Sequence, residues 1–147
     1  MDAGEPPASD LVEAMIVELI PLYGRIDVPG MPKAGPDEFR PPGGVFLVGF
    51  DGDGSAVCGG GVKDLGGGIA EIKRMYVVPE ARGRGLARVL LVALEDAARE
   101  LGYERVRLDT GPKQPAAEHL YRSAGYGEIE NFNANFMASF WGEKRLR

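Results

Sequence analysis

The sequence predicts a single α+β domain: a mixed, mostly antiparallel, twisted sheet with helices beside it. Three observations predict this class. The length of 147 residues suits one domain of ordinary size. Three runs with strand-like composition follow one another between residues 45 and 78. Helical and strand-like segments then alternate to the end of the chain, an order typical of a mixed sheet with helices packed on it.

Composition and charge exclude several classes of protein. Charged residues make up 27% of the chain and hydrophobic residues 44%, which is typical of a folded soluble domain and not of a disordered or membrane-spanning one. A formal net charge of −5 argues against nonspecific attraction to nucleic acid or anionic lipid, so neither is expected as a partner. One cysteine, Cys58, and one histidine, His119, cannot build a zinc cluster, and no metal is expected. Residues 1–7 lack the features of a signal peptide, so we expect a cytoplasmic protein.

The first third of the chain contains one predicted helix and a long loop. Residues 1–9 are polar and proline-rich and are expected to be flexible. Asp10 and Glu13 have the spacing of a capping box, so a helix is predicted from Asp10, and Pro21 should bend or end it. Residues 24–44 are rich in glycine and proline and predict a long loop with one short helical turn.

A meander of three strands follows the loop. The strands are predicted at 45–50, 55–63 and 70–78, separated by turns rich in aspartate and glycine. Alternation along the third strand places the side chains of Lys73 and Arg74 on opposite faces. Pro79 ends this strand.

The rest of the chain alternates between helices and strands. Leucines at helical spacing predict a helix over 84–101, closed by Gly102. The strand at 105–110 should run parallel to its neighbour because a helix of crossover length precedes it. A short helix that begins at Pro115 and ends before Gly125 precedes two predicted strands at 126–132 and 136–141, joined by an asparagine-rich turn at 133–135.

The most informative segment joins the end of the third strand to the long helix. It reads Arg82-Gly83-Arg84-Gly85-Leu86-Ala87. Glycines at this point let the backbone turn tightly, and the unpaired amides and positive dipole end of a helix favour a phosphate group. Taken alone, the same residues are equally consistent with an ordinary turn that carries solvated arginines.

With its neighbouring motifs, this segment resembles the GNAT superfamily of N-acetyltransferases. Arg82-x-x-Gly85-x-Ala87 matches the family signature, and residues 71–79 look like the family's fourth strand. Downstream, Gln114-x-x-Ala117-x-x-x-Tyr121-x-x-x-Gly125-Tyr126 looks like its second cofactor motif. The resemblance covers about residues 45 to 146 and departs from the family at the start, because residues 1–9 cannot supply the strand that usually precedes the first helix.

The resemblance implies a site for acetyl-CoA as acetyl donor. Main-chain groups near Met75, Val77 and Val78 would pair with the pantetheine arm, and backbone amides of the cofactor loop would hold the pyrophosphate; this loop comprises Arg82, Gly83, Arg84, Gly85, Leu86 and Ala87. Gln114 stands where the family has an asparagine that touches the cofactor.

Two residues take catalytic roles in this interpretation. Tyr121 occupies the position of the tyrosine thought to protonate the departing thiolate, although its spacing alone favours a core aromatic. Glu71 occupies a position where some members carry a glutamate that acts as base through water. The alternative for Glu71 is an outward carboxylate paired with Lys73 or Arg105.

The acceptor and the assembly stay open at this level. The leading hypothesis is acetyl transfer to a primary amine, of a small molecule or a peptide, by direct attack in a ternary complex. Its alternatives are a module that senses or presents acyl-CoA without turnover and, less favoured by the acidic charge balance, an Arg-Gly nucleic-acid domain. The family builds its acceptor site from segments that correspond to residues 23–40 and 131–141 here. Relatives pair through the C-terminal region, so a homodimer is one of the assemblies considered.

Overall fold

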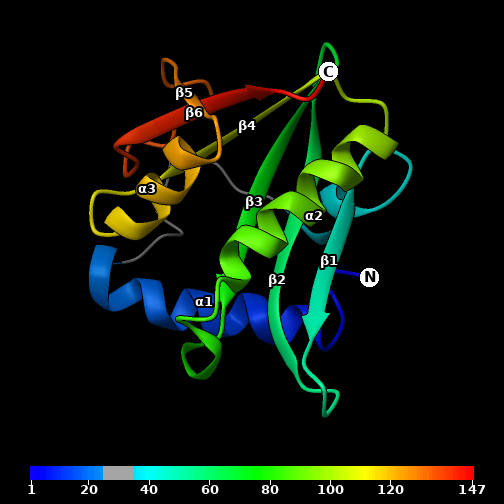
Figure 1. Cartoon of the computed structure of the whole chain (residues 1–147), viewed down its shortest axis with the longest axis vertical. Coiled ribbons are helices and arrows are strands. Elements are labelled where there is room, and N and C mark those ends of the chain that lie inside the picture. The colour runs from blue at the N-terminus through cyan, green and yellow to red at the C-terminus, as the bar shows by residue number, and fades with distance from the viewer. Residues whose placement is uncertain (25–34) are drawn as a thin grey trace.

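A computed structural model describes residues 1–24 and 35–147 of the chain (Figure 1). The sheet contains six strands in one layer, and none of the helices in these two ranges is long and apolar enough to cross a membrane. The elements, in chain order, are α1 Ala8–Tyr23, η1 Pro36–Phe39, β1 Val45–Phe50, β2 Ala56–Gly66, β3 Ile69–Val77, η2 Pro79–Ala81, α2 Leu86–Glu100, β4 Arg105–Thr110, α3 Pro115–Ser123, β5 Gly127–Glu128 and β6 Phe140–Arg145.

The strand order is β1-β2-β3-β4-β6-β5. All neighbours are antiparallel except β3 and β4, which run parallel and are connected through α2. A parallel pair needs such a crossover because a tight turn can only reverse the chain. The predicted α+β class, the meander and the parallel step are therefore confirmed.

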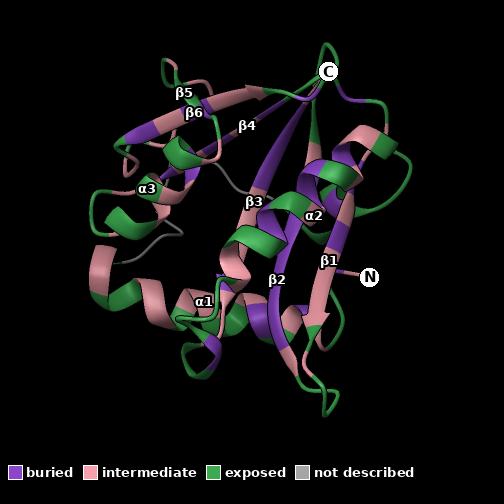
Figure 2. Ribbon diagram, in the orientation of Figure 1, coloured by how far each residue is buried: buried purple, intermediate pink, exposed green. Residues whose placement is uncertain are grey.

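The two long helices cover opposite faces of the sheet. Neighbouring residues of β2 show this, since a Cβ at Gly59 would meet Leu11 of α1 and one at Gly60 would meet Leu94 of α2. Successive side-chain positions of a strand point to opposite faces, so β2 lies between the helices (Figure 1). Both faces of β2 are consequently covered, and Figure 2 shows the buried residues concentrated in the central strands and on the sheet-facing side of α2.

Strands β3 and β4 separate soon after they meet. They pair only over Ile69–Glu71 and Arg105–Arg107, although β3 continues to Val77. In Figure 1 the two strands diverge from the end at which they pair. The edge of β3 beyond Glu71 that faces β4 is therefore free of strand pairing within the described residues.

A bulge in β3 changes which face its residues occupy. The β2–β3 register shifts between Gly59 and Gly61, and Arg74 has a φ of 60°. Lys73 pairs with Gly61, whose Cβ would meet the ring of Phe39, and the Arg74 guanidinium lies 5.2 Å from that same ring. Lys73 and Arg74 thus share a face, and the prediction from simple alternation is wrong because a bulge adds one residue to the strand.

The start of the chain differs from its prediction. Helix α1 begins at Ala8 without a side-chain cap, so Asp10 lies in the first turn, and the helix continues through Pro21 to Tyr23. Within residues 1–9, which we expected to be flexible, Ala3 and Ala8 are buried and the terminal amino group donates to the carbonyl oxygen of Phe46 at 2.9 Å. The predicted loop contains η1 in its described part; its residues 25–34 lie outside the described residues.

The last two predicted strands are also corrected. The structure has the two-residue β5 and then β6 from Phe140, in place of strands at 126–132 and 136–141. Side-chain oxygens of Asn131, Asn133 and Asn135 accept hydrogen bonds from backbone amides within this segment. Asparagine side chains compete with strand pairing in this way, so the chain turns here and joins β4 only from Phe140 onward.

Candidate active site

The cofactor loop has the geometry of an anion-binding turn. Gly83 and Gly85 have φ values of 83° and 75°, which favour glycine, and Gly85 immediately precedes α2. The amides in the first turn of a helix lack intrahelical acceptors, and no side chain caps this helix end. Residues 82–85 are exposed, whereas Leu86 and Ala87 are half-buried at the start of the helix. A phosphate could approach these amides without displacing a side chain.

The arginines of this region connect the loop to other elements. The Arg82 guanidinium donates to both carboxylate oxygens of Glu18 on α1, at 2.7 and 2.8 Å, and to the carbonyl oxygen of Val77 at 3.0 Å. Arg84 donates to the carbonyl oxygen of Glu80. Arg82 therefore links the loop to α1 as well as adding positive charge.

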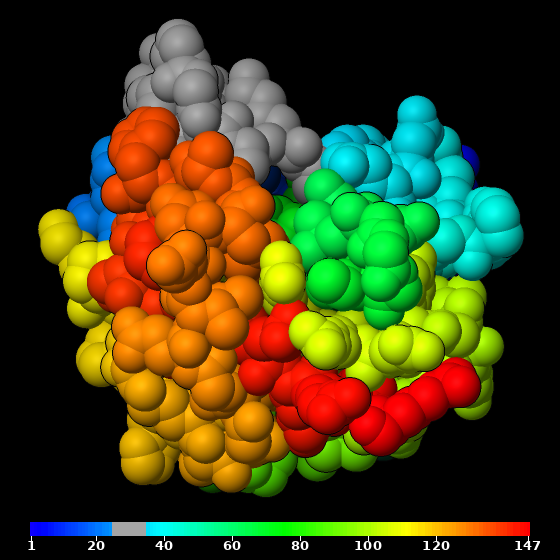
Figure 3. All heavy atoms as spheres, turned by 90° about the horizontal axis from the view of Figure 1, so that it is seen from above, coloured from blue at the N-terminus to red at the C-terminus, as the bar shows by residue number. Residues whose placement is uncertain are grey.

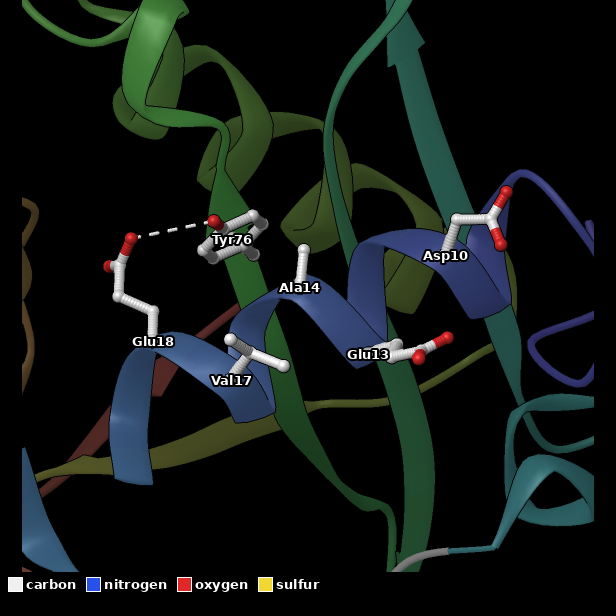
Figure 4. A pocket seen from close by; sticks show the side chains of 6 residues that line it. All are labelled: Asp10, Glu13, Ala14, Val17, Glu18 and Tyr76. Atoms are coloured by element: carbon white, nitrogen blue, oxygen red, sulfur yellow. Dashed lines mark hydrogen bonds between the residues drawn. The ribbon is translucent and has the colours of Figure 1, made fainter. Parts of the chain in front are cut away.

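An open pocket of about 460 Å³ lies along α1 on the Glu18 side (Figure 4). Figure 4 shows Glu18 and Tyr76 turned toward each other at one end, where the Tyr76 hydroxyl donates to Glu18 Oε1 at 3.4 Å. The lining residues are Asp10, Glu13, Ala14, Val17, Glu18 and Tyr76. The pocket is thus bordered by three carboxylates, and one of them, Glu18, is also the partner of Arg82.

Tyr121 extends from α3 to the separated part of β3. Its side chain is buried, and its hydroxyl donates to Met75 Sδ at 3.8 Å. Burial, followed by the negative charge of Asp109, raises the pKa of the Tyr121 phenol well above its usual value. The hydroxyl is therefore protonated at neutral pH and able to donate a proton toward Met75.

Three other residues assigned to the cofactor, Val77, Val78 and Gln114, have partners of their own. The Val78 amide donates to the Val57 carbonyl oxygen at 2.9 Å and the Val77 carbonyl oxygen accepts from Arg82, so these two groups already have partners. Gln114 precedes α3, and its side-chain oxygen accepts from the hydroxyl of Tyr23 at 3.4 Å. The glutamine thus contacts the end of α1, an arrangement that the motif alone does not predict.

Glu71 lies on the opposite side of β3 from α2. Its side chain is buried, and its nearest cations are Lys73 Nζ at 3.7 Å and Lys63 Nζ at 4.0 Å. The predicted alternative of an outward carboxylate is wrong in its exposure but right about Lys73, whereas Arg105 lies beside Glu143. Burial raises the pKa of the Glu71 carboxyl above its usual value, against the lowering effects of Lys73 and Asn133.

Sequence reasoning missed two residues beside Glu71. Asn133 Nδ2 donates to Glu71 Oε2 at 2.9 Å and to Asp109 Oδ2 at 2.5 Å. Asp109 lies on the outward alternation of β4, and Asn133 lies in a turn, so neither position attracts attention in the sequence. Figure 3 shows the segment before β6, in orange, on the same face of the molecule as the β2–β3 turn, in green.

Most of the chain matches one known protein family. A match to the "Acetyltransferase (GNAT) family" spans residues 13–126. The chain belongs to this family. An uncharacterized N-acetyltransferase of Schizosaccharomyces pombe is 36% identical over 99 residues, which cover 67% of this chain and 61% of that protein. The chain spans about half to two thirds of the length of the curated relatives that it matches.

Solved structures show the same GNAT fold. A protein described as an acyl-CoA N-acyltransferase of Klebsiella pneumoniae is 27% identical, with a TM-score of 0.81 over 100% of this chain and 94% of that one. A phosphinothricin acetyltransferase of Sinorhizobium meliloti, solved in complex with acetyl-CoA, is 19% identical with a TM-score of 0.58, covering 68% of this chain and 60% of that one. The GNAT fold and the family membership expected from the sequence are confirmed.

Proposed function

We propose that this chain transfers an acetyl group from acetyl-CoA to a primary amine by direct attack within a ternary complex. The observation that carries the proposal is the position of the Tyr121 hydroxyl, 3.8 Å from Met75 Sδ at the separated part of β3. A buried, protonated phenol at this strand can stabilise and protonate a leaving sulfur. An acyl-CoA sensor that performs no chemistry has no need of such a group.

The cofactor loop would hold the donor. Its two positive-φ glycines and uncapped helix end offer amides to a pyrophosphate, and the free edge of β3 offers main-chain groups to an extended pantetheine arm. The residues present therefore fit acetyl-CoA, which supplies the activated acetyl group as a substrate.

Glu71 and Tyr121 would share the proton transfers. An aliphatic ammonium has a pKa near ~10.4 and must lose a proton before it can attack. Glu71 accepts that proton, through water because its carboxylate is buried. As the new C–N bond forms and the C–S bond breaks, the Tyr121 hydroxyl delivers a proton to the sulfur, and the resulting phenolate regains a proton, through water, from the nitrogen that has formed the amide. Lys63 and Lys73 lie at 4.0 and 3.7 Å from Glu71 and favour its ionised form.

Two measurements test this function in sequence. Thermal unfolding with and without excess acetyl-CoA reports binding, since a ligand at 100 times its Kd stabilises by about 2.7 kcal/mol. A screen of primary amines for thiol release then reports turnover. Thermal stabilisation followed by amine-dependent thiol release supports the proposal. Stabilisation without release from any amine favours the acyl-CoA sensor, and no stabilisation contradicts both.

A further inference from the structure

One asparagine side chain joins the two carboxylates on the α1-covered face of the sheet. Asn133 Nδ2 donates to Glu71 Oε2 on β3 and Asp109 Oδ2 on β4, at 2.9 and 2.5 Å. Asn135 Nδ2 donates to the same Asp109 oxygen at 3.1 Å. β3 and β4 pair only as far as Glu71 and Arg107, so this amide connects the strands at the point where their backbone pairing ends.

The orientation of the Asn133 amide is determined by its other contacts. Its Oδ1 accepts from the indole Nε1 of Trp141 at 3.3 Å and from the backbone amide of Asn135 at 3.1 Å. Both of these groups are donors only, so they must meet the carbonyl oxygen, and the NH₂ group is directed at the carboxylates. A reversed amide would place oxygen against two carboxylates and lose every one of these bonds.

Several other charged groups surround Glu71. Lys73 lies on the same strand and Lys63 on β2, where it also contacts Glu38 of η1 at 2.8 Å. On β4, Arg107 pairs with Glu71 in register but donates to Glu143, at 2.9 Å. Asp109 is thus the negative neighbour that shares a hydrogen-bond donor with Glu71. Its charge raises the pKa of Glu71 and that of Tyr121, so it acts on both groups assigned to the proton transfers.

We propose that Asn133 and Asp109 are positioning residues of the transfer site. Asn133 favours the ionised form of the Glu71 carboxylate and orients it to accept a proton. Asp109 strengthens the attraction of that carboxylate for the proton of the acceptor amine. This inference rests on the proposed function, because it gives Glu71 the role of base. It goes beyond that function by assigning roles to residues of β4 and of the segment before β6.

The two residues act on Glu71 in opposite directions, which makes the proposal testable without an acceptor. Asn133→Ala removes a donor to the ionised carboxylate, so the pKa of Glu71 should rise. Asp109→Asn removes a negative charge, so the pKa should fall. A carbon-13 titration of the Glu71 carboxyl resonance measures both shifts. Damage to the fold would expose Glu71 and lower its pKa in both variants, so shifts of equal sign, or none, overturn the proposal.

Two further variants separate a specific contact from general loop damage. Asn131→Ala is the matched control, since the Asn131 side chain accepts from the backbone amides of Asn133 and Ala134 in the same turn. It should leave the Glu71 titration unchanged. Trp141→Phe removes the Nε1 donor that orients Asn133, and should raise the pKa of Glu71 by less than Asn133→Ala does. A shift in Asn131→Ala as large as that in Asn133→Ala contradicts the proposal.

Activity provides the second readout. With an amine found by thiol release, the acidic limb of kcat/KM should move to higher pH in Asn133→Ala and to lower pH in Asp109→Asn, following the titrations. A limb that stays in place while Glu71 titrates differently overturns the positioning role and leaves acetyl transfer intact. Absence of transfer to every amine in the parent protein contradicts the proposed function itself, and the positioning role with it.

Discussion

Tyr121 and Tyr126 are both buried, and their rings lie 6.0 Å apart, but their hydroxyl groups have different partners. The Tyr121 hydroxyl points to Met75 Sδ on β3, whereas the Tyr126 hydroxyl donates to Glu95 of α2 at 2.8 Å. Glu95 also contacts Lys144 of β6 at 3.1 Å. Tyr126 therefore belongs to a buried polar cluster that joins a helix to the sheet, and Tyr121 is the phenol that we propose as the proton donor.

Removal of each hydroxyl should consequently have a different effect. Tyr121→Phe is expected to lower kcat about 100-fold, the scale of a lost general acid, and to leave acetyl-CoA binding nearly unchanged. Tyr126→Phe should keep kcat but cost about 1–3 kcal/mol of stability, because Glu95 loses a buried partner. Thiol-release kinetics and thermal unfolding of both variants check this. Equal losses of kcat would contradict the assignment of Tyr121.

Glu71, the base that we propose, also affects the stability of the fold. A carboxyl whose pKa is raised by folding binds its proton more tightly in the folded state, so its contribution to stability is present at low pH and is lost as pH rises through the folded pKa. Glu71→Gln should therefore unfold at a higher temperature than the parent protein at neutral pH, with the difference disappearing near about pH 4, and should lose acetyl transfer. Thermal unfolding at the two pH values tests it. If the Gln variant is less stable than the parent protein at neutral pH, the attraction of Lys63 and Lys73 for the Glu71 carboxylate outweighs the cost of burying its charge.

At the scale of elements, the junction of β3 and α2 depends on backbone conformation. Gly85 has a positive φ and stands where the helix amides open to solvent. No atom lies within 4 Å of a Cβ built there, so a substitution meets strain but no steric clash. The side chain added at this position would occupy space in front of the helix end.

Gly85→Glu should abolish the stabilisation by acetyl-CoA, since a carboxylate would repel the pyrophosphate from these amides. Gly54→Glu is the matched control: Gly54 has a φ of 87° in the β1–β2 turn and has equally open surroundings. Both variants should lose about 1–2 kcal/mol through the strained backbone, but only the Gly54 variant should keep the thermal shift with acetyl-CoA. Retention of the shift in Gly85→Glu would exclude this loop as the pyrophosphate site.

At the scale of the whole molecule, Arg82 connects the cofactor loop to the helix on the other face of the sheet. Its guanidinium donates hydrogen bonds to Glu18, while its backbone belongs to the loop that we propose as the pyrophosphate site. The side chains of this ion pair are about half exposed, at 45% and 39%, so the pair contributes little to stability. A pyrophosphate at the proposed site would compete with Glu18 for this guanidinium.

Glu18→Gln should release Arg82 and tighten acetyl-CoA binding about two- to fivefold, the scale of an exposed ion pair. Glu13→Gln is the control, because Glu13 lines the same pocket on α1 (Figure 4). Titration calorimetry at low and high salt measures both, and the gain should shrink as salt screens the charges. Equal affinities in the two variants would show that Glu18 does not compete for Arg82.

Local sequence was sufficient for most elements, because hydrophobic spacing, glycine positions and proline positions act within a few residues. It failed where longer-range contacts or side-chain bonds to the backbone decided the outcome. The bulge at Arg74 reversed a face assignment, and the asparagine-rich segment replaced most of two predicted strands. The site was predicted in part for the same reason: Glu71 and Tyr121 belong to local motifs, whereas Asp109 and Asn133 do not.

By itself the sequence determined the order of elements, the α+β class, and the glycine turn in front of α2, since each follows from periodicity and from the conformations that glycine and proline allow. Only the tertiary structure decided that Glu71 is buried, that Tyr121 reaches Met75, and that Asn133 joins Glu71 to Asp109. These three facts depend on where β3 and β4 separate and on what the later segments place there. The physical reason is that proton affinity and hydrogen bonding depend on distance in space, and residues 71, 109 and 133 meet only when the sheet assembles.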